Sequence, residues 1–77
     1  MNAQRRKMIE TLIAGLEPLK QVVEDLAIME EEAFENMPEG LQASERGEAA
    51  ERASEALTDA NGSFEDVLSA LNTALEA

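Results

Sequence analysis

Apolar residues recur at alternating steps of three and four along the first half of the chain, the spacing of a helix that buries one stripe. The stripe consists of Ile9, Leu12, Leu16, Leu19, Val23 and Leu26. It weakens toward Met37, while the apolar face beside it is widened by Ile13, Val22, Ala27 and Met29. A face this wide indicates packing against more than one neighbouring helix. We therefore predict a helix over residues 3–36, with Asn2 as its N-cap.

Pro18 lies inside this predicted helix. A proline in a helix interior removes a backbone hydrogen bond and collides with the preceding turn, which costs about 3 kcal/mol. The apolar stripe nevertheless keeps its phase across Pro18, which falls on the outward side of the helix. We predict a kink that bends the helix around its core, with a complete break as the alternative.

A polar stretch punctuated by proline and glycine follows, so residues 37–43 are predicted to form a loop. Ser44 is the expected N-cap of a second helix over residues 44–76. The second stripe has the same spacing and consists of Ala50, Ala53, Leu57, Ala60, Phe64, Val67, Leu71 and Ala74. Its small residues come first, which indicates that the two helices approach closely near the loop.

The segment TDANGSFEDVL, residues 58–68, contains an Asn-Gly pair that is typical of a helix end. The stripe keeps its phase across the pair, since Leu57 precedes it and Phe64 follows at heptad distance. We predict a continuous helix, with a break at 61–63 as the alternative. A calcium loop starting at Asp59 is excluded, because its sixth and twelfth positions hold phenylalanine and alanine instead of glycine and glutamate.

Two long helices joined by a short loop are expected to fold back on each other. We predict an all-α fold with one domain over residues 1–77, an antiparallel two-helix hairpin that places Ile9 near Leu71 and Leu19 near Ala60. A lone hairpin exposes part of each broad face, so we expect a homodimer that forms a four-helix bundle. The expected oligomer core comprises Ile9, Leu12, Leu16, Leu19, Val23, Leu26, Leu57, Phe64, Leu68 and Leu71.

The 77 residues include 17 acidic and 6 basic ones, for a net charge of −11. Such a surface repels nucleic-acid phosphates and anionic lipids, so direct binding to either is not expected. No apolar run approaches the roughly 18 residues that span a bilayer. We therefore expect a cytoplasmic protein that does not bind membranes.

No catalytic or metal site is indicated by the composition. The chain lacks histidine, cysteine and tyrosine, so its serines have no partner of the kind that activates a nucleophile. A narrow bundle also offers no pocket for a substrate. We predict a protein that is not an enzyme and has no cofactor and no metal. The acidic run near the loop is expected to be a solvated charged face, because bundle metal sites use histidine beside carboxylates.

Apolar residues gather around the predicted loop, where they either cap the end of the bundle core or dock a partner. With the acidic run before them they form the candidate partner-binding set: Phe34, Met37, Pro38, Leu41, Glu30, Glu31, Glu32 and Glu35. The only basic patch, QRRK at residues 4–7, is expected to pair with Glu76 and the C-terminal carboxylate across the hairpin.

The segment EEEAFENMPEGLQASERGEAAERASEAL, residues 30–57, resembles a group of small acidic proteins encoded by tailed phages and prophages. The shared pattern is Glu-Ala-Phe at 32–34, Asn-apolar-Pro-Glu at 36–39, Leu-Gln at 41–42 and Ser-Glu-Arg at 44–46. The resemblance implies an accessory protein in the host-cell cytoplasm and carries no activity or catalytic residue.

We accordingly expect a non-enzymatic accessory protein that binds itself and one host or phage protein, for example to inhibit host defence. One alternative is a structural oligomerisation module whose acidic surface serves solubility. The other is an acidic DNA mimic that blocks a nucleic-acid-binding protein, since carboxylates along a rigid rod approximate the spacing of phosphates.

Overall fold

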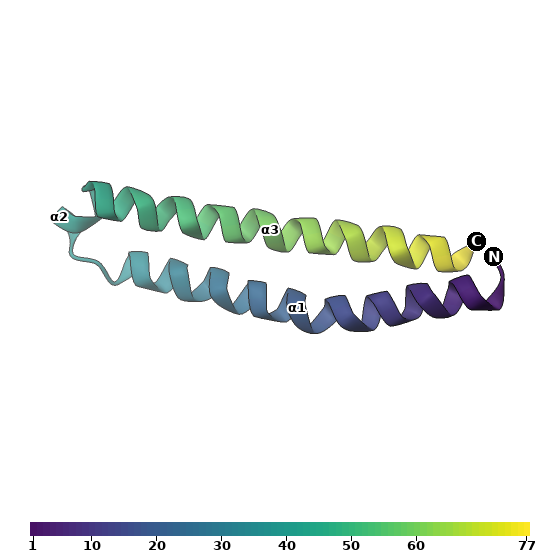
Figure 1. Cartoon of the computed structure of the whole chain (residues 1–77). Coiled ribbons are helices and arrows are strands. Elements are labelled where there is room, and N and C mark those ends of the chain that lie inside the picture. The colour runs from purple at the N-terminus through teal and green to yellow at the C-terminus, as the bar shows by residue number, and fades with distance from the viewer.

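The computed structural model describes residues 1–77 as one antiparallel helical hairpin (Figure 1). Helix α1 spans Ala3–Glu35, α2 is a single turn over Glu39–Gln42, and α3 spans Glu45–Glu76. The molecule is a rod with backbone dimensions of 58 × 16 × 13 Å, and both termini lie at the end opposite α2. The predicted all-α fold and the hairpin are confirmed.

Both predicted N-caps are present. The Asn2 side chain accepts a hydrogen bond from the Arg5 backbone N–H at 2.9 Å, and the Ser44 hydroxyl accepts one from the Gly47 N–H at 3.4 Å. Each cap satisfies one of the backbone donors that a helix start leaves without an intrahelical partner. The two long helices therefore begin where local side-chain chemistry directs them to begin.

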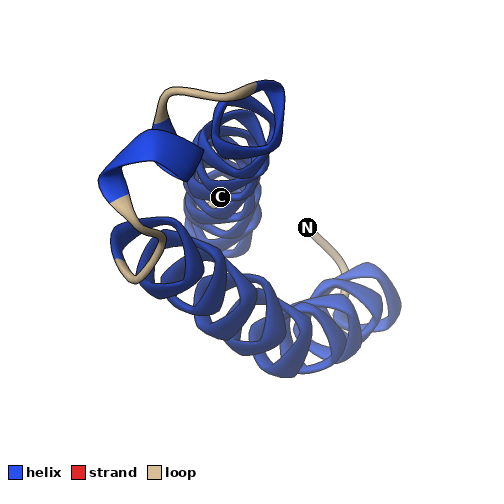
Figure 2. Ribbon diagram, turned by 90° about the vertical axis from the view of Figure 1, so that its left-hand side faces the viewer, coloured by secondary structure: helices blue, strands red, loops and turns tan.

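Neither long helix is broken. Helix α1 continues through the exposed Pro18, and its ribbon is visibly curved along its length (Figures 1 and 2). Helix α3 continues through residues 61–63, where the Ser63 hydroxyl donates to the Asp59 carbonyl at 3.2 Å. The phase of the apolar stripes was thus the better guide than the helix-breaking residues, because packing against a second helix outweighs a local propensity cost of 1 to about 3 kcal/mol.

The connection is more ordered than the predicted loop over 37–43. Its second half forms α2, whose first turn is closed by hydrogen bonds from the Leu41 and Gln42 N–H groups to the Pro38 carbonyl at 2.9 and 3.1 Å. The Gln42 side chain donates to the Phe34 carbonyl at 3.0 Å and so caps the C-terminal end of α1. Figure 2 shows α2 bridging the two long helices at this end.

The contact between α1 and α3 runs along heptad positions that we call the seam. On α1 these are Ile9, Ile13, Leu16, Lys20, Val23, Ala27, Glu30 and Phe34; on α3 they are Gly47, Ala50, Ser54, Leu57, Asn61, Phe64, Leu68, Leu71 and Leu75. All are half-buried except Gly47, which is buried, and no hydrophobic side chain is fully buried. The hairpin alone therefore has no enclosed core.

The predicted α1 stripe is divided by this arrangement. Ile9, Leu16 and Val23 lie in the seam, whereas the alternate members of the stripe lie beside the seam and stay exposed. These are Leu12, Leu19 and Leu26, which are 50%, 54% and 42% exposed. One neighbouring helix covers only one side of α1, so it cannot bury both halves of so wide a face.

The basic patch does not form the predicted pair with Glu76. Instead the Arg6 guanidinium donates to the backbone carbonyl of Leu75 at 2.7 Å. The last carbonyls of a helix have no intrahelical donor, so a cation placed at that end binds them directly. This bond also fixes the antiparallel register, because it joins the first turn of α1 to the last turn of α3.

Candidate protein-binding faces of the hairpin

The seam divides the hairpin into two unlike faces. In an antiparallel helix pair, the residues that directly follow the seam positions of both helices lie on one side, and those that directly precede them lie on the other. Two surface grooves agree with this geometry. One contains Glu31 and Glu55, which follow seam positions, and the other contains Ala60 and Val67, which precede them.

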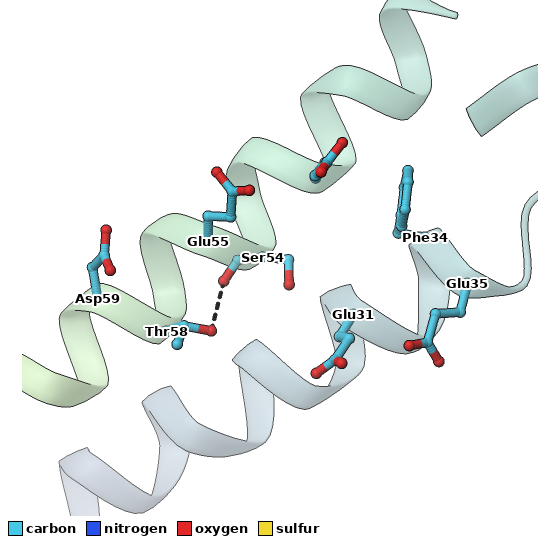
Figure 3. A pocket seen from close by; sticks show the side chains of 8 residues that line it. Glu31, Phe34, Glu35, Ser54, Glu55, Thr58 and Asp59 are labelled. Carbon is cyan, nitrogen blue, oxygen red and sulfur yellow. Dashed lines mark hydrogen bonds between the residues drawn. The ribbon is translucent and has the colours of Figure 1, made fainter. Parts of the chain in front are cut away.

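The residues that follow the seam form an acidic face. It carries Glu10, Glu17, Glu24, Glu31 and Glu35 from α1 and Glu48, Glu51, Glu55, Glu65 and Glu76 from α3. An open groove of about 510 Å³ runs along its α2 half, and Phe34 is the only hydrophobic residue among the eight that line it. Figure 3 shows the Phe34 ring between the helices, with glutamates from both helices along its flanks.

Lys20 is the only cation that forms ion pairs in the hairpin. Its ammonium nitrogen lies 3.6 Å from a Glu24 carboxylate oxygen and 3.5 Å from one of Glu65. Partly exposed pairs of this kind contribute little to stability, typically about 0–1 kcal/mol. The remaining carboxylates of the acidic face have no cationic partner within the chain, so the face has a strong negative field.

The residues that precede the seam form an apolar face. On α1 these are Met8, Leu12, Gly15, Leu19, Val22, Leu26, Met29 and Ala33; on α3 they are Arg46, Ala49, Ala53, Ala56, Ala60, Ser63, Val67, Ala70 and Ala74. Of these seventeen residues only Arg46, at the α2 end of the face, is charged. Large side chains on α1 remain open to solvent, with Met8 and Met29 exposed by 63% and 62%. An open groove of about 420 Å³ lies between the two helices on this face.

The middle of the seam is polar. Lys20 and Asn61 occupy facing levels there, midway along the apolar face. The Asn61 side-chain oxygen is buried and has no hydrogen-bond partner in the hairpin. A buried acceptor without a hydrogen bond costs about 1–3 kcal/mol. A donor supplied by a second molecule at this position would therefore stabilise the protein.

The candidate partner-binding residues near the loop differ in exposure. Phe34 and Met37 are half-buried, whereas Pro38 and Leu41 are exposed. Among the glutamates, Glu31 and Glu35 line the acidic groove, Glu30 lies in the seam, and Glu32 is exposed outside the groove. No group of three or more acidic side chains is placed to hold a metal ion.

Sequence reasoning expected a broad apolar face that a lone hairpin leaves partly exposed, but it did not separate the part that faces α3 from the part that stays open. It also did not include Met8, Ala49, Ala56 and Ala70, which the structure places on the open part. The sequence does contain this open face, as a second heptad stripe displaced by one residue from the seam. The two stripes can be told apart only when the side of each helix that contacts the other helix is known.

The chain matches no protein-family model, no curated protein and no solved structure. Neither long helix contains an apolar segment of the length and hydropathy that crossing a membrane requires. The geometry defines an amphipathic helical hairpin with one acidic face and one apolar face, and its function is argued from those two surfaces.

Proposed function

We propose that the protein is a non-enzymatic binding module whose working unit is a homodimer. Two hairpins join through their apolar faces into a four-helix bundle, which turns both acidic faces outward. The observation that carries this proposal is a continuous apolar face, with Arg46 at one end as its single charge, on a chain that buries no hydrophobic side chain by itself. Monomeric proteins seldom leave so large an apolar surface in water.

The dimensions of the face suit a stable interface. A surface 58 Å long and 16 Å wide offers roughly 900 Å² to a partner. Specific protein interfaces commonly bury about 800 Å² on each side. A chain of 77 residues is marginal as an isolated domain, and a dimer supplies the enclosed core that the hairpin lacks.

The outer surfaces of the dimer are then available for a different protein. The acidic faces favour a partner with a basic surface, because complementary charge steers association. The resemblance of residues 30–57 to phage accessory proteins makes a host or phage protein the first partner to test, with inhibition of a host defence protein as the specific hypothesis.

The dimer is tested by light scattering on the full chain and on Leu19→Glu. The expected mass of the unmodified protein is twice its chain mass of 8.4 kDa. Leu19→Glu places a charge in the centre of the apolar face and is expected to give a monomer. Gln21→Glu adds the same charge on the acidic side of α1 and should remain a dimer. A folded, unmodified protein with the mass of one chain would overturn the proposal.

The density of unpaired carboxylates supports DNA mimicry as a second candidate. Only Lys20 pairs with acidic residues, and the proposed dimer carries two glutamate-rich faces on opposite sides of a rod. A pull-down from host lysate at low and high salt separates the two functions. A mimic should retain nucleic-acid-binding proteins at low salt and lose them at high salt, since exposed charges are screened. A dedicated partner should be retained at both.

A further inference from the structure

We infer that the two hairpins pair in antiparallel fashion, about a two-fold axis perpendicular to the helices. In this arrangement α1 packs on the partner's α1 and α3 on the partner's α3. Each α2 end then lies over the terminal end of the other copy. The inference rests on the proposed dimer and specifies which surfaces of the second copy occupy the apolar face.

The distribution of charge along the rod favours this orientation. The half that contains α2, residues 21–61, has 12 acidic and 2 basic side chains, for a net charge of −10. The half that contains both termini has 5 acidic and 4 basic ones, for a net charge of −1. Parallel pairing would stack the two strongly negative halves on each other. Antiparallel pairing places each over a nearly neutral half, which reduces the repulsion between the two copies.

The shapes of the two apolar stripes are compatible with like-on-like packing. The α3 stripe is almost entirely alanine, so two copies of α3 can approach closely, because the distance between helix axes follows the size of the contact side chains. On α1, full overlap of the apolar faces sets Gly15 opposite the partner's Leu26 and Met8 opposite the partner's Ala33. A large side chain therefore meets a small one at both of these levels.

The polar layer, formed by Lys20 and Asn61 in the middle of the seam, fixes the register of the two hairpins in the dimer. Lys20 and Asn61 lie midway along the apolar face, so antiparallel pairing with full overlap brings both polar layers to the two-fold axis. The buried Asn61 oxygen then has the amide of the partner's Asn61 within its layer as a donor. A slip of one heptad would set each polar layer against the partner's Ile13 and Leu68 in one direction, and against the partner's Ala27 and Ser54 in the other. Only the unslipped register pairs the two Asn61 side chains, and single buried polar positions specify register in this way.

Spin-label distances test the orientation, and the absence of native cysteine makes the labelling unambiguous. Ala43→Cys places a label at the exposed end of α2, and Asp59→Cys places one on the exposed surface of α3 near the midpoint. Antiparallel pairing predicts about 48 Å between the two labels at position 43, since α3 begins next to this position at Glu45, which lies 16 residues of helix from the midpoint at 1.5 Å per residue. Labels at position 59 should lie within about 35 Å of each other in either orientation.

Measurements at the two label positions distinguish a wrong orientation from the absence of a dimer. A long distance at position 43 with a short one at position 59 supports antiparallel pairing. A distance below about 35 Å at both positions overturns it in favour of parallel pairing, in which each α1 lies over the partner's α3. No dipolar coupling at position 59, together with a monomer mass, overturns the dimer itself. Helix content measured by circular dichroism checks that both variants are folded.

Discussion

Replacing Gly47 by alanine tests whether α2 packs closely against the start of α3. Gly47 is the only buried residue in the chain. A Cβ atom added there would collide with the backbone carbonyl oxygens of Gln42 and Leu41. These atoms are held by α2, by the Gln42 bond to α1 and by the Ser44 N–H bond to the Leu41 carbonyl at 3.1 Å, so they have little room to move.

Two opposing effects set the size of the change. Overpacking a tight site costs about 1–3 kcal/mol. Alanine also gains about 1 kcal/mol over glycine inside a helix. Because the added Cβ atom would meet backbone atoms rather than a flexible side chain, the upper part of that range, about 2–3 kcal/mol, applies, and the net loss is about 1–2 kcal/mol. For a domain of this size each 1 kcal/mol changes Tm by about 4–8 °C, so the melting temperature should fall by about 5–15 °C.

Gly62→Ala is the matched control, because it makes the same chemical change in the same helix. Nothing lies within 4 Å of an added Cβ atom at this position, so only the gain in helix propensity remains. Thermal unfolding followed by circular dichroism should show a higher Tm for Gly62→Ala and a lower one for Gly47→Ala. Both proteins must be compared at one concentration, since the melting of a dimer depends on it. Equal or greater stability of Gly47→Ala would refute the close packing of α2 on α3.

Three further perturbations probe the cap, the charge and the polar layer. Gln42→Ala removes the bond to the Phe34 carbonyl and should lower the free energy of unfolding by about 1 kcal/mol in urea titrations; no change would mean that this cap is not formed in solution. Raising the salt concentration should lower the dimer dissociation constant in sedimentation experiments, because two chains of charge −11 repel each other; a rise would contradict an apolar interface. Asn61→Leu should raise Tm but broaden the distance distribution at a position 43 label, whereas an unchanged narrow distribution would show that the polar layer does not set the register.

The segment that connects α1 and α3 contains one feature that local sequence predicted and one that it did not. Ser44 was predicted as an N-cap from its own chemistry and the residues beside it, and the structure confirms it. The α2 turn was not predicted, because four residues carry no readable periodicity. It is held by contacts with residues distant in sequence: the Gln42 side chain reaches Phe34 on α1, and Gly47 lets the turn approach α3.

By itself, the sequence determined the helices and their continuity. The caps at both helix starts depend only on neighbours within one turn. The unbroken heptad phase across Pro18 and residues 61–63 is also visible in the sequence, and it indicates that one face continues to pack through both sites. Only the tertiary structure decided which part of each wide apolar arc is covered. The α1 sequence contains two overlapping stripes, and the less hydrophobic one, with Lys20 and Glu30 in it, faces α3. That choice depends on the orientation of the opposite helix, and it leaves the more hydrophobic stripe open on the surface.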